Sequence, residues 1–477
     1  MDWLSLNTGP RGGETLYRQL YWRFRDAIAS GKLAAGDRVP SVRALAGELH
    51  IAKGTVETAY QMLISEGYLQ SAGPAGTRVS PRLDAILPAP APAAPAHSLP
   101  AEERADTGVQ PFQAGIPALD AFPRKTWVRL TTRHLRKLAE NSLAYPPPGG
   151  LPALRHALAS YLGISRGIRC TPDQVLITSG YAASLTLICR SLLQAGDTGW
   201  FEEPGFHHAR RVLLQAGMHL QAVPVDEEGL NVAAGRQAAE HAHFAVVTPT
   251  HQSPLGVALS LPRRLALLDW AARRNAWIIE DDYDSEFRYH GHPLPALKSL
   301  DHDGRVLYAG TFSKVLYPGL RLAYLVVPQQ EAARFHDTAR ALQSGSPLLM
   351  QQVVADFIDN GHFSRHLQKM RVLYAQRRAW LTHALEQAFG ASIRIPPRAG
   401  GIHVLAYLNH GADDTAIAAL ANAQGLAIQA LNNWRTDSAA AMPPGLLLGF
   451  ANLHSAGQAA ELVNRLKQAA GALLPPV

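Results

Sequence analysis

The chain has 477 residues, a length typical of two or three domains. Apolar residues make up 47% and charged residues 17%, which excludes an intrinsically disordered chain. The net charge of +7 permits nucleic-acid binding without requiring it. Two cysteines exclude a disulfide framework and favour a reducing compartment. The absence of a signal-peptide pattern or an apolar run of membrane-spanning length predicts a cytoplasmic protein without membrane contact.

Residues 12–80 are predicted to form a winged helix-turn-helix domain. Apolar residues recur at four-residue spacing from Leu16 to Ile28, as in an amphipathic helix. Ser41 is a candidate N-cap of a second helix, and a third is expected from about 53 to 66. The segment 68–80 has two short β-type runs around a Gly/Pro turn, which predicts a hairpin.

Residues 81–107 are rich in proline and alanine, including the run PAPAPAAPA. Alternating Pro and Ala favour extended polyproline geometry, so this segment is predicted to be a semi-rigid linker between two domains. An irregular surface loop of a single domain is the alternative.

Residues 108–477 show the pattern of an α/β domain. Short β-rich runs mostly alternate with helical stretches such as 262–274, which predicts a largely parallel sheet with helices on both faces. Ligands of such sheets lie beyond the carboxyl ends of the strands. The predicted strands are 175–180, 198–205, 244–249, 276–283, 305–310 and 322–327.

Lys314 follows one of these strands, in the segment GTFSKVLYPGLRLAYLVV. A lysine forms a Schiff base through its neutral amine, which burial or a nearby cation favours by lowering the pKa. Arg321 is a candidate for that cation or for a phosphate ligand, and Thr311 and Ser313 offer hydroxyls to the same phosphate. A surface lysine at a strand end is the alternative.

The strand from Trp277 ends in the acidic run Glu280-Asp281-Asp282-Tyr283-Asp284. A carboxylate beneath a pyridine ring keeps the ring nitrogen protonated, which makes pyridoxal phosphate an electron sink. Tyr283 is placed to bond the phenolic oxygen of that ring. A solvated loop is the alternative; a Mg²⁺ or Ca²⁺ site is less favoured, because no EF-hand or Walker spacing accompanies the carboxylates.

The order of these motifs resembles a known family. The segments YPPPGGLPALR, TSG, EEPGF, TPTHQSPLG, EDDYDSEFRY and TFSKVLYPGLR resemble fold-type I, class I/II aminotransferases. The segment RVPSVRALAGELHIAKGTVETAYQMLISEGYLQS matches the GntR pattern, and together they resemble the MocR subfamily of GntR-type transcriptional regulators. The resemblance covers nearly the whole chain apart from the linker.

This resemblance implies a pyridoxal 5'-phosphate site in a homodimer with composite sites. Lys314 would hold the cofactor as a Schiff base, with Asp281 on the ring nitrogen and Tyr283 on the phenolic oxygen. The remaining implied contacts are an aromatic stack from Phe206, phosphate binding by Arg321, Thr311, Ser313 and the helix opening at Gly180, and a phosphate contact from Tyr145 to the other subunit.

Three departures from the family pattern bear on function. Tyr181-Ala182-Ala183 stand where hydroxyl and amide side chains usually follow TSG. The loop that usually supplies an asparagine to the phenolic oxygen reads HQSPLG, so that role passes to Gln252 or is absent. Leu447 aligns with the arginine that binds the substrate's α-carboxylate, which argues against ordinary amino-acid transamination. Candidates for a replacement contact are Arg435, His207 and His208.

The first domain is expected to bind double-stranded operator DNA. Residues 1–80 hold nine Lys+Arg and seven Asp+Glu, so the phosphate footprint of each protomer is small. Lys53 and Thr55 begin the recognition helix, the end that meets base edges. Arg43 matches an arginine of the GntR motif, and Arg38, Ser41 and Arg78 are expected on the DNA backbone. A winged helix used for protein contacts is the alternative.

Three functional hypotheses follow. The first is a transcriptional regulator that senses a small amino compound through bound pyridoxal phosphate, and the second makes pyridoxal phosphate itself the effector. The third is an active class I/II aminotransferase with a residual DNA-binding domain. The sequence does not indicate the effector, the operator, the regulated genes or the sign of regulation.

Overall fold

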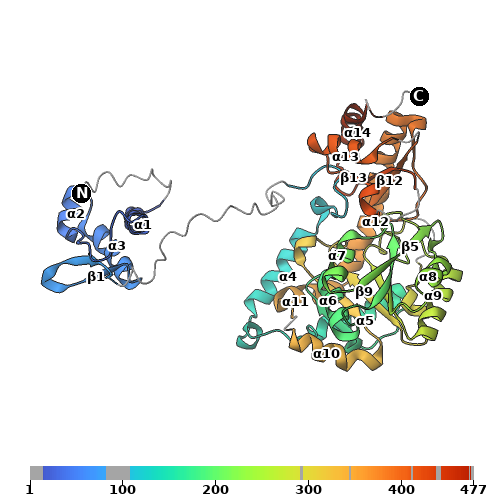
Figure 1. Cartoon of the computed structure of the whole chain (residues 1–477), viewed down its shortest axis with the longest axis horizontal. Helices are drawn as coiled ribbons and strands as arrows, with labels where there is room; N and C mark the ends of the chain where they lie inside the picture. The colour runs from blue at the N-terminus through green and yellow to red at the C-terminus, as the bar shows by residue number, and fades with distance from the viewer. Residues whose placement is uncertain are drawn as a thin grey trace. The chain divides into compact units, whose positions relative to one another are not determined.

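The computed structural model describes residues 14–81, 108–289, 294–342, 345–409, 412–436, 442–471 and 473. The chain forms two compact units, Met1–Ala105 and Asp106–Val477 (Figure 1). The predicted linker, apart from residue 81, lies outside the described residues.

The small unit contains three helices and a hairpin, in the order predicted for a winged helix-turn-helix. The helices are α1 (Leu16–Ala29), α2 (Val42–Glu48) and α3 (Lys53–Ser65), followed by β1 (Leu69–Ser71) and β2 (Thr77–Val79). Their apolar faces share one core, in which Phe24, Leu45 and Leu63 are fully buried. Ser41 caps α2, because its hydroxyl accepts the Ala44 amide at 3.2 Å.

The large unit is built on an eight-stranded sheet with the order β3-β10-β9-β8-β7-β4-β5-β6. Strands β5, β4, β7, β8 and β9 pair in parallel, while β10 runs antiparallel to β3 and β9, and β6 to β5. The predicted, largely parallel sheet is thus confirmed. Its strands are β3 (Val175–Thr178), β4 (Thr198–Glu203), β5 (His219–Asp226), β6 (Gly229–Leu230), β7 (Phe244–Val247), β8 (Trp277–Asp282), β9 (Val306–Thr311) and β10 (Ala323–Val326).

Helices cover both faces of this sheet, and its central strands are therefore buried on both sides. Phe244 and Val246 of β7 face α6, α7 and α10, whereas Ala245 and Val247 face α8 and α9. The covering helices are α4 (Arg124–Arg136), α5 (Pro152–Arg166), α6 (Tyr181–Leu192), α7 (His207–Gln215), α8 (Val232–Ala239), α9 (Leu261–Arg274), α10 (Ala332–Ala341) and α11 (Leu348–Asp359).

A second, antiparallel sheet follows the long helix α12 (His362–Phe389). It has the order β11-β12-β14-β13 and lies with α13 (Asp414–Ala423) and α14 (Ala456–Ala470) at one end of the large unit (Figure 1). Its strands are β11 (Ile393–Arg394), β12 (His403–Leu408), β13 (Gln429–Ala430) and β14 (Gly445–Gly449). None of the described helices is both long and apolar enough to span a membrane.

Candidate functional site

A cavity of about 410 Å³ lies beyond the carboxyl ends of β8 and β9. Seven of the nine residues predicted to bind the cofactor line it: Phe206, Asp281, Tyr283, Thr311, Ser313, Lys314 and Arg321. Residues far apart in the sequence therefore meet at the sheet edge where α/β proteins bind ligands.

Lys314 projects into this cavity close to the backbone of residue 115. Its Nζ donates a hydrogen bond to the Gly115 carbonyl oxygen at 2.7 Å. Gly115 has a φ of +80°, a left-handed conformation that favours glycine, and a Cβ there would lie 2.8 Å from Nζ. Burial lowers the pKa of Lys314, while Asp284 and Asp281 oppose that shift. The neutral amine is therefore favoured by burial rather than by Arg321.

The acidic run is divided between the two faces of β8. Glu280 accepts the amides of Leu297 and Lys298, each at 2.8 Å, and Asp282 pairs with Arg166 at 2.6 Å. Asp281, between them, faces the cavity. Alternation along a strand thus gives the neighbouring carboxylates separate partners. The described residues contain no cluster of three or more His, Cys, Asp or Glu side chains suited to a metal ion.

Asp281 is a buried carboxylate with no ion-pair partner among the described residues. Burial raises its pKa to about 8. The nearby Tyr181 hydroxyl opposes this rise in the pKa of Asp281. That hydroxyl makes no hydrogen bond of good geometry to any residue in the described part of the chain. A cation placed in the cavity beside Asp281 would restore the usual charge state of the carboxyl group.

Tyr283 joins the cavity to a second buried carboxylate. Its hydroxyl lies 2.9 Å from His251 Nδ1, and the same nitrogen lies 3.0 Å from Asp284. Burial raises the pKa of Tyr283 well above its usual value, so its phenol stays protonated at neutral pH. A neutral tyrosine held in this way can donate a hydrogen bond to an oxygen in the cavity.

Arg321 provides a positive charge at the end of the cavity where α6 begins. Its guanidinium makes no side-chain hydrogen bond or ion pair to any residue in the described part of the chain. Gly180, which precedes α6, has a φ of +111°, and a Cβ there would lie 2.9 Å from Arg321 Nη2. The Thr311 and Ser313 hydroxyls, 3.1 Å apart, line the same cavity. Free amides, a guanidinium and hydroxyls form a donor set suited to phosphate.

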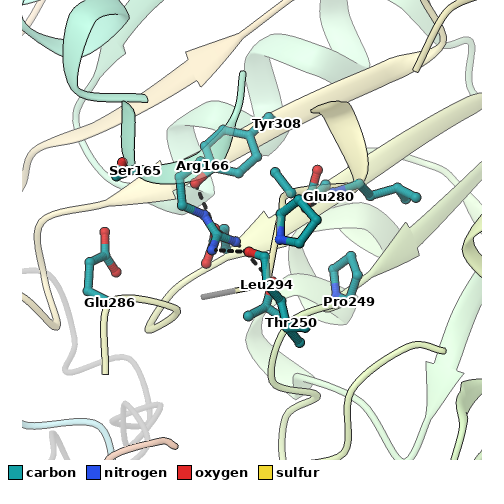
Figure 2. A network of polar contacts seen from close by, with 12 residues as sticks. Ser165, Arg166, Pro249, Thr250, Glu280, Glu286, Leu294 and Tyr308 are labelled. Carbon is teal, nitrogen blue, oxygen red and sulfur yellow. Dashed lines mark hydrogen bonds and ion pairs between the residues drawn. The ribbon is translucent and has the colours of Figure 1, made fainter. Parts of the chain in front are cut away.

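Beneath the site, Arg166 at the end of α5 holds three segments together (Figure 2). Its guanidinium donates to the Leu294 carbonyl at 2.8 Å and to the Thr250 hydroxyl at 2.9 Å, in addition to its ion pair with Asp282. Tyr308 also donates to Asp282, at 2.6 Å. This network fixes the loop after β7 against the end of β8, and no motif in the sequence indicated it.

Of the two alternatives for the role of the usual loop asparagine, the structure favours its absence, because Gln252 does not line the cavity. Gln252 is buried, and its amide nitrogen donates to the carbonyl oxygens of Pro204 and Ser253, at 2.8 and 2.9 Å. Its Oε1 accepts the Leu255 amide at 3.0 Å, so the side chain is satisfied within its own loop. Ser253 lines the cavity instead.

The wall nearest the C-terminal sheet contains residues that no sequence motif indicated. They are Ile402, His403, Gln429 and Trp434. Leu447, singled out as the position of a missing arginine, lies on the same wall and is 1% exposed. His207 and His208 also line the cavity, at the start of α7, whereas Arg435 donates to Asn432 at 3.1 Å and is not among the lining residues. Tyr145 lies outside the cavity and is 94% exposed.

In the small unit, the residues expected on base edges lie on α2 and α3. Lys53 is the first residue of α3 and is exposed, and Thr55 is half-buried two positions later. Arg43 is exposed on α2. The structure therefore leaves both basic side chains accessible to a ligand.

The residues expected on the DNA backbone surround the hairpin and the start of α2. The side chains of Arg38 and Arg78 are exposed, and their backbones form an isolated antiparallel β-bridge. The Arg78 guanidinium also donates a hydrogen bond to the Gly36 carbonyl at 2.9 Å. Ser41 uses its hydroxyl oxygen to cap α2, which leaves the hydroxyl hydrogen for another acceptor.

Comparisons with known proteins identify both units. Residues 113–465 match the class I and II aminotransferase family, and residues 16–79 match the gntR family of bacterial regulatory proteins. The chain is 36% identical to the probable rhizopine catabolism regulatory protein MocR of Rhizobium meliloti, over 92% of this chain and 90% of that relative. The chain is a MocR-type transcriptional regulator.

Two further similarities extend over most of this MocR-type regulator. It is 31% identical to the pyridoxine biosynthesis transcriptional regulator PdxR of Corynebacterium glutamicum, over 94% of each chain. The kynurenine aminotransferase of Pyrococcus horikoshii, solved in complex with PMP, matches 78% of this chain and 93% of its own, with a TM-score of 0.70 and 26% identity. The fold-type I aminotransferase architecture predicted from the sequence is therefore confirmed.

Proposed function

We propose that this MocR-type regulator binds pyridoxal phosphate at Lys314, and that a small amino compound in the same cavity changes its affinity for operator DNA. The observation that carries the proposal is the meeting of a half-buried lysine, a buried carboxylate without a cation and a free guanidinium around one cavity. The GntR domain of the same chain is the part that binds operator DNA in this proposal.

The residues of the cavity fit pyridoxal phosphate in three separate respects. Lys314 supplies the amine for the aldehyde, and Asp281 supplies the negative charge for a protonated ring nitrogen. Arg321, the start of α6 and the hydroxyls of Thr311 and Ser313 receive the phosphate. When bound, the cofactor supplies an aldehyde that condenses with primary amines and a ring that withdraws electrons.

Sensing is favoured over ordinary amino-acid transamination because of the wall at Leu447. This buried leucine lies where the family presents an arginine to an α-carboxylate, so a standard amino acid lacks that anchor. The alternative in which pyridoxal phosphate is itself the effector receives support from the similarity to a regulator of pyridoxine biosynthesis. His207, His208 and Trp434 extend the cavity beyond the residues assigned to the cofactor, which favours a second ligand.

The proposal includes a cytoplasmic homodimer. Tyr145 is almost fully exposed and lies outside the cavity of its own chain, as expected for a side chain that completes the phosphate site of a partner subunit. A dimer also doubles the modest positive charge that each small unit offers to DNA.

The DNA-binding role is tested by removing single positive charges from the small unit. Arg43→Ala and Lys53→Ala should each weaken binding to operator fragments, since a contact of Arg or Lys to a base contributes about 1–3 kcal/mol. Titration by gel shift measures the loss. Lys32→Ala, which removes an exposed charge in the turn after α1, is the control and should change affinity little. Equal losses in all three variants would contradict specific readout by α2 and α3.

A further inference from the structure

Helix α4 and its C-cap present a large excess of positive charge on the surface of the large unit. Residues 124–137 hold six Lys+Arg and no Asp or Glu, against a net charge of +7 for the whole chain. The helix buries Trp127 and Leu130 and lies beside α11 (Figure 1). All six cations are exposed: Arg124, Lys125, Arg129, Arg133, Arg136 and Lys137. One exposed helix thus carries an excess of charge close to that of the entire chain.

Four of these cations form one row along the helix. Lys125, Arg129 and Arg133 follow one another at four-residue spacing, and Arg136 continues the row three residues later. At 1.5 Å per residue this row is about 16 Å long. A solvated helix face usually places opposite charges at this spacing, whereas like charges repel and weaken the helix. The row therefore gains stability from an anion outside the helix.

Two further cations extend the row onto α12. His362, the first residue of α12, lies between the two helices: its Nε2 is 3.3 Å from Arg129 Nη2, and its Nδ1 is 2.9 Å from Arg365 Nη2. Burial lowers the pKa of His362 and the guanidiniums of Arg365 and Arg129 lower it further, so the ring is neutral at neutral pH. Arg365 and Lys369 are exposed. The six residues of this basic surface are Lys125, Arg129, Arg133, Arg136, Arg365 and Lys369.

Acidic side chains neutralise only part of this basic surface. Asp356 of α11 pairs with Arg133 and His134, and Asp359 is exposed at the end of the same helix. Between α4 and α12 lies a hollow of about 270 Å³, whose lining includes the side chains of Arg129, Arg133 and His362. In the described part of the chain, five cations of the surface have no ion pair: Lys125, Arg129, Arg136, Arg365 and Lys369.

We propose that this basic surface binds the phosphate backbone of operator DNA, in addition to the contacts of the small unit. The inference rests on the DNA binding of the proposed function and does not depend on pyridoxal phosphate. Residues 1–80 hold nine Lys+Arg and seven Asp+Glu, so the small unit neutralises few phosphates. Duplex DNA carries one negative charge per about 1.7 Å of its axis, so a row about 16 Å long faces several phosphates. Such contacts raise affinity without reading bases.

The test is the salt dependence of DNA binding by the full-length protein. The test variant carries Lys125→Gln, Arg129→Gln and Arg136→Gln, and its affinity for an extended operator fragment is measured by fluorescence anisotropy over a range of salt concentrations. We expect binding at least about tenfold weaker than that of the native protein at about 0.1 M salt. The slope of log affinity against log salt should fall by about 2–3, because each lost phosphate contact removes about 0.9.

A control variant removes the same number of charges elsewhere on the large unit. It carries Arg273→Gln, Arg334→Gln and Arg340→Gln, three exposed arginines that each pair with a neighbouring acid. Its affinity and salt slope should match those of the native protein. Equal behaviour of the test and control variants would overturn the inference. A variant with Arg129→Lys and Arg136→Lys keeps the charges and should retain native affinity; a loss as large as that of the test variant would also overturn it.

The competing use of this surface is an interface between copies of the chain. Val128 and Leu135 are also exposed on α4, as in a protein contact. Size-exclusion chromatography, run first, decides between the two uses, because a changed oligomeric state in the test variant would assign the surface to a subunit interface and overturn the inference. A native protein that binds no operator fragment refutes the DNA binding of the proposed function, whereas equal binding by the native protein and the test variant refutes this inference alone.

Discussion

Lys314→Ala will abolish covalent attachment of pyridoxal phosphate. The native protein mixed with the cofactor should absorb visible light, and borohydride should remove that band and fix the cofactor to Lys314. The reason is that burial lowers the pKa of this amine, which favours the neutral, nucleophilic form inside the cavity. The variant should show neither the band nor the adduct, as measured by absorbance and by mass spectrometry of peptides.

An internal control for this result is Lys298. Burial also lowers the pKa of Lys298, but it does not line the cavity; its Nζ donates to the Val306 carbonyl. Its peptide should remain unmodified in the same spectrum. A cofactor adduct on Lys298, or an unchanged visible band in Lys314→Ala, would show that reactivity follows burial alone and that the cavity is not the cofactor site.

Arg166→Met will lower the free energy of unfolding of the large unit by about 3–5 kcal/mol, the usual cost of leaving one partner of a buried ion pair without its counter-charge. The side chains of Arg166 and Asp282 are 4% and 2% exposed, so water cannot replace the missing guanidinium. The loss of the contacts to Leu294 and Thr250 adds to the effect. Urea titration followed by circular dichroism provides the measurement.

Two further variants show whether charge or packing causes this loss. Arg273→Met removes an exposed arginine that pairs with Asp269 and should cost about 0–1 kcal/mol. The double variant Arg166→Met, Asp282→Asn removes both buried charges and should recover part of the stability. No recovery in the double variant would mean that the hydrogen bonds and packing of Arg166, rather than the ion pair, stabilise the network.

The part of the site built on the parallel sheet could be predicted from the sequence. Asp281 and Lys314 follow apolar runs that become β8 and β9, and the carboxyl ends of neighbouring parallel strands meet at one edge. The strong apolar pattern of these strands is sufficient to locate that meeting point. The helices of the small unit could be predicted equally well, because their apolar residues recur at helical spacing.

The wall of the cavity could not be predicted in the same way. Gln429 lies in a strand of only two residues, too short to show any alternation, and its partner Leu447 comes 18 positions later. Ser253 lines the cavity and Gln252 does not, because hydrogen bonds within the loop hold the Gln252 side chain away from it. No periodicity of the sequence indicates such hydrogen bonds. Arg166 was missed because it pairs with a carboxylate 116 positions away.

The central claim, that occupancy of the Lys314 cavity controls DNA binding, is tested most directly by the dissociation constant for operator DNA. The operator is first selected from random fragments, and its affinity is then measured by fluorescence anisotropy with and without pyridoxal phosphate and a primary amine that the loaded protein binds. Coupling between two sites is reciprocal, so operator DNA must shift amine affinity by the factor by which the amine shifts DNA affinity. We predict a changed dissociation constant in the native protein and an unchanged one in Lys314→Ala; identical values in the native protein with and without both ligands would contradict the claim.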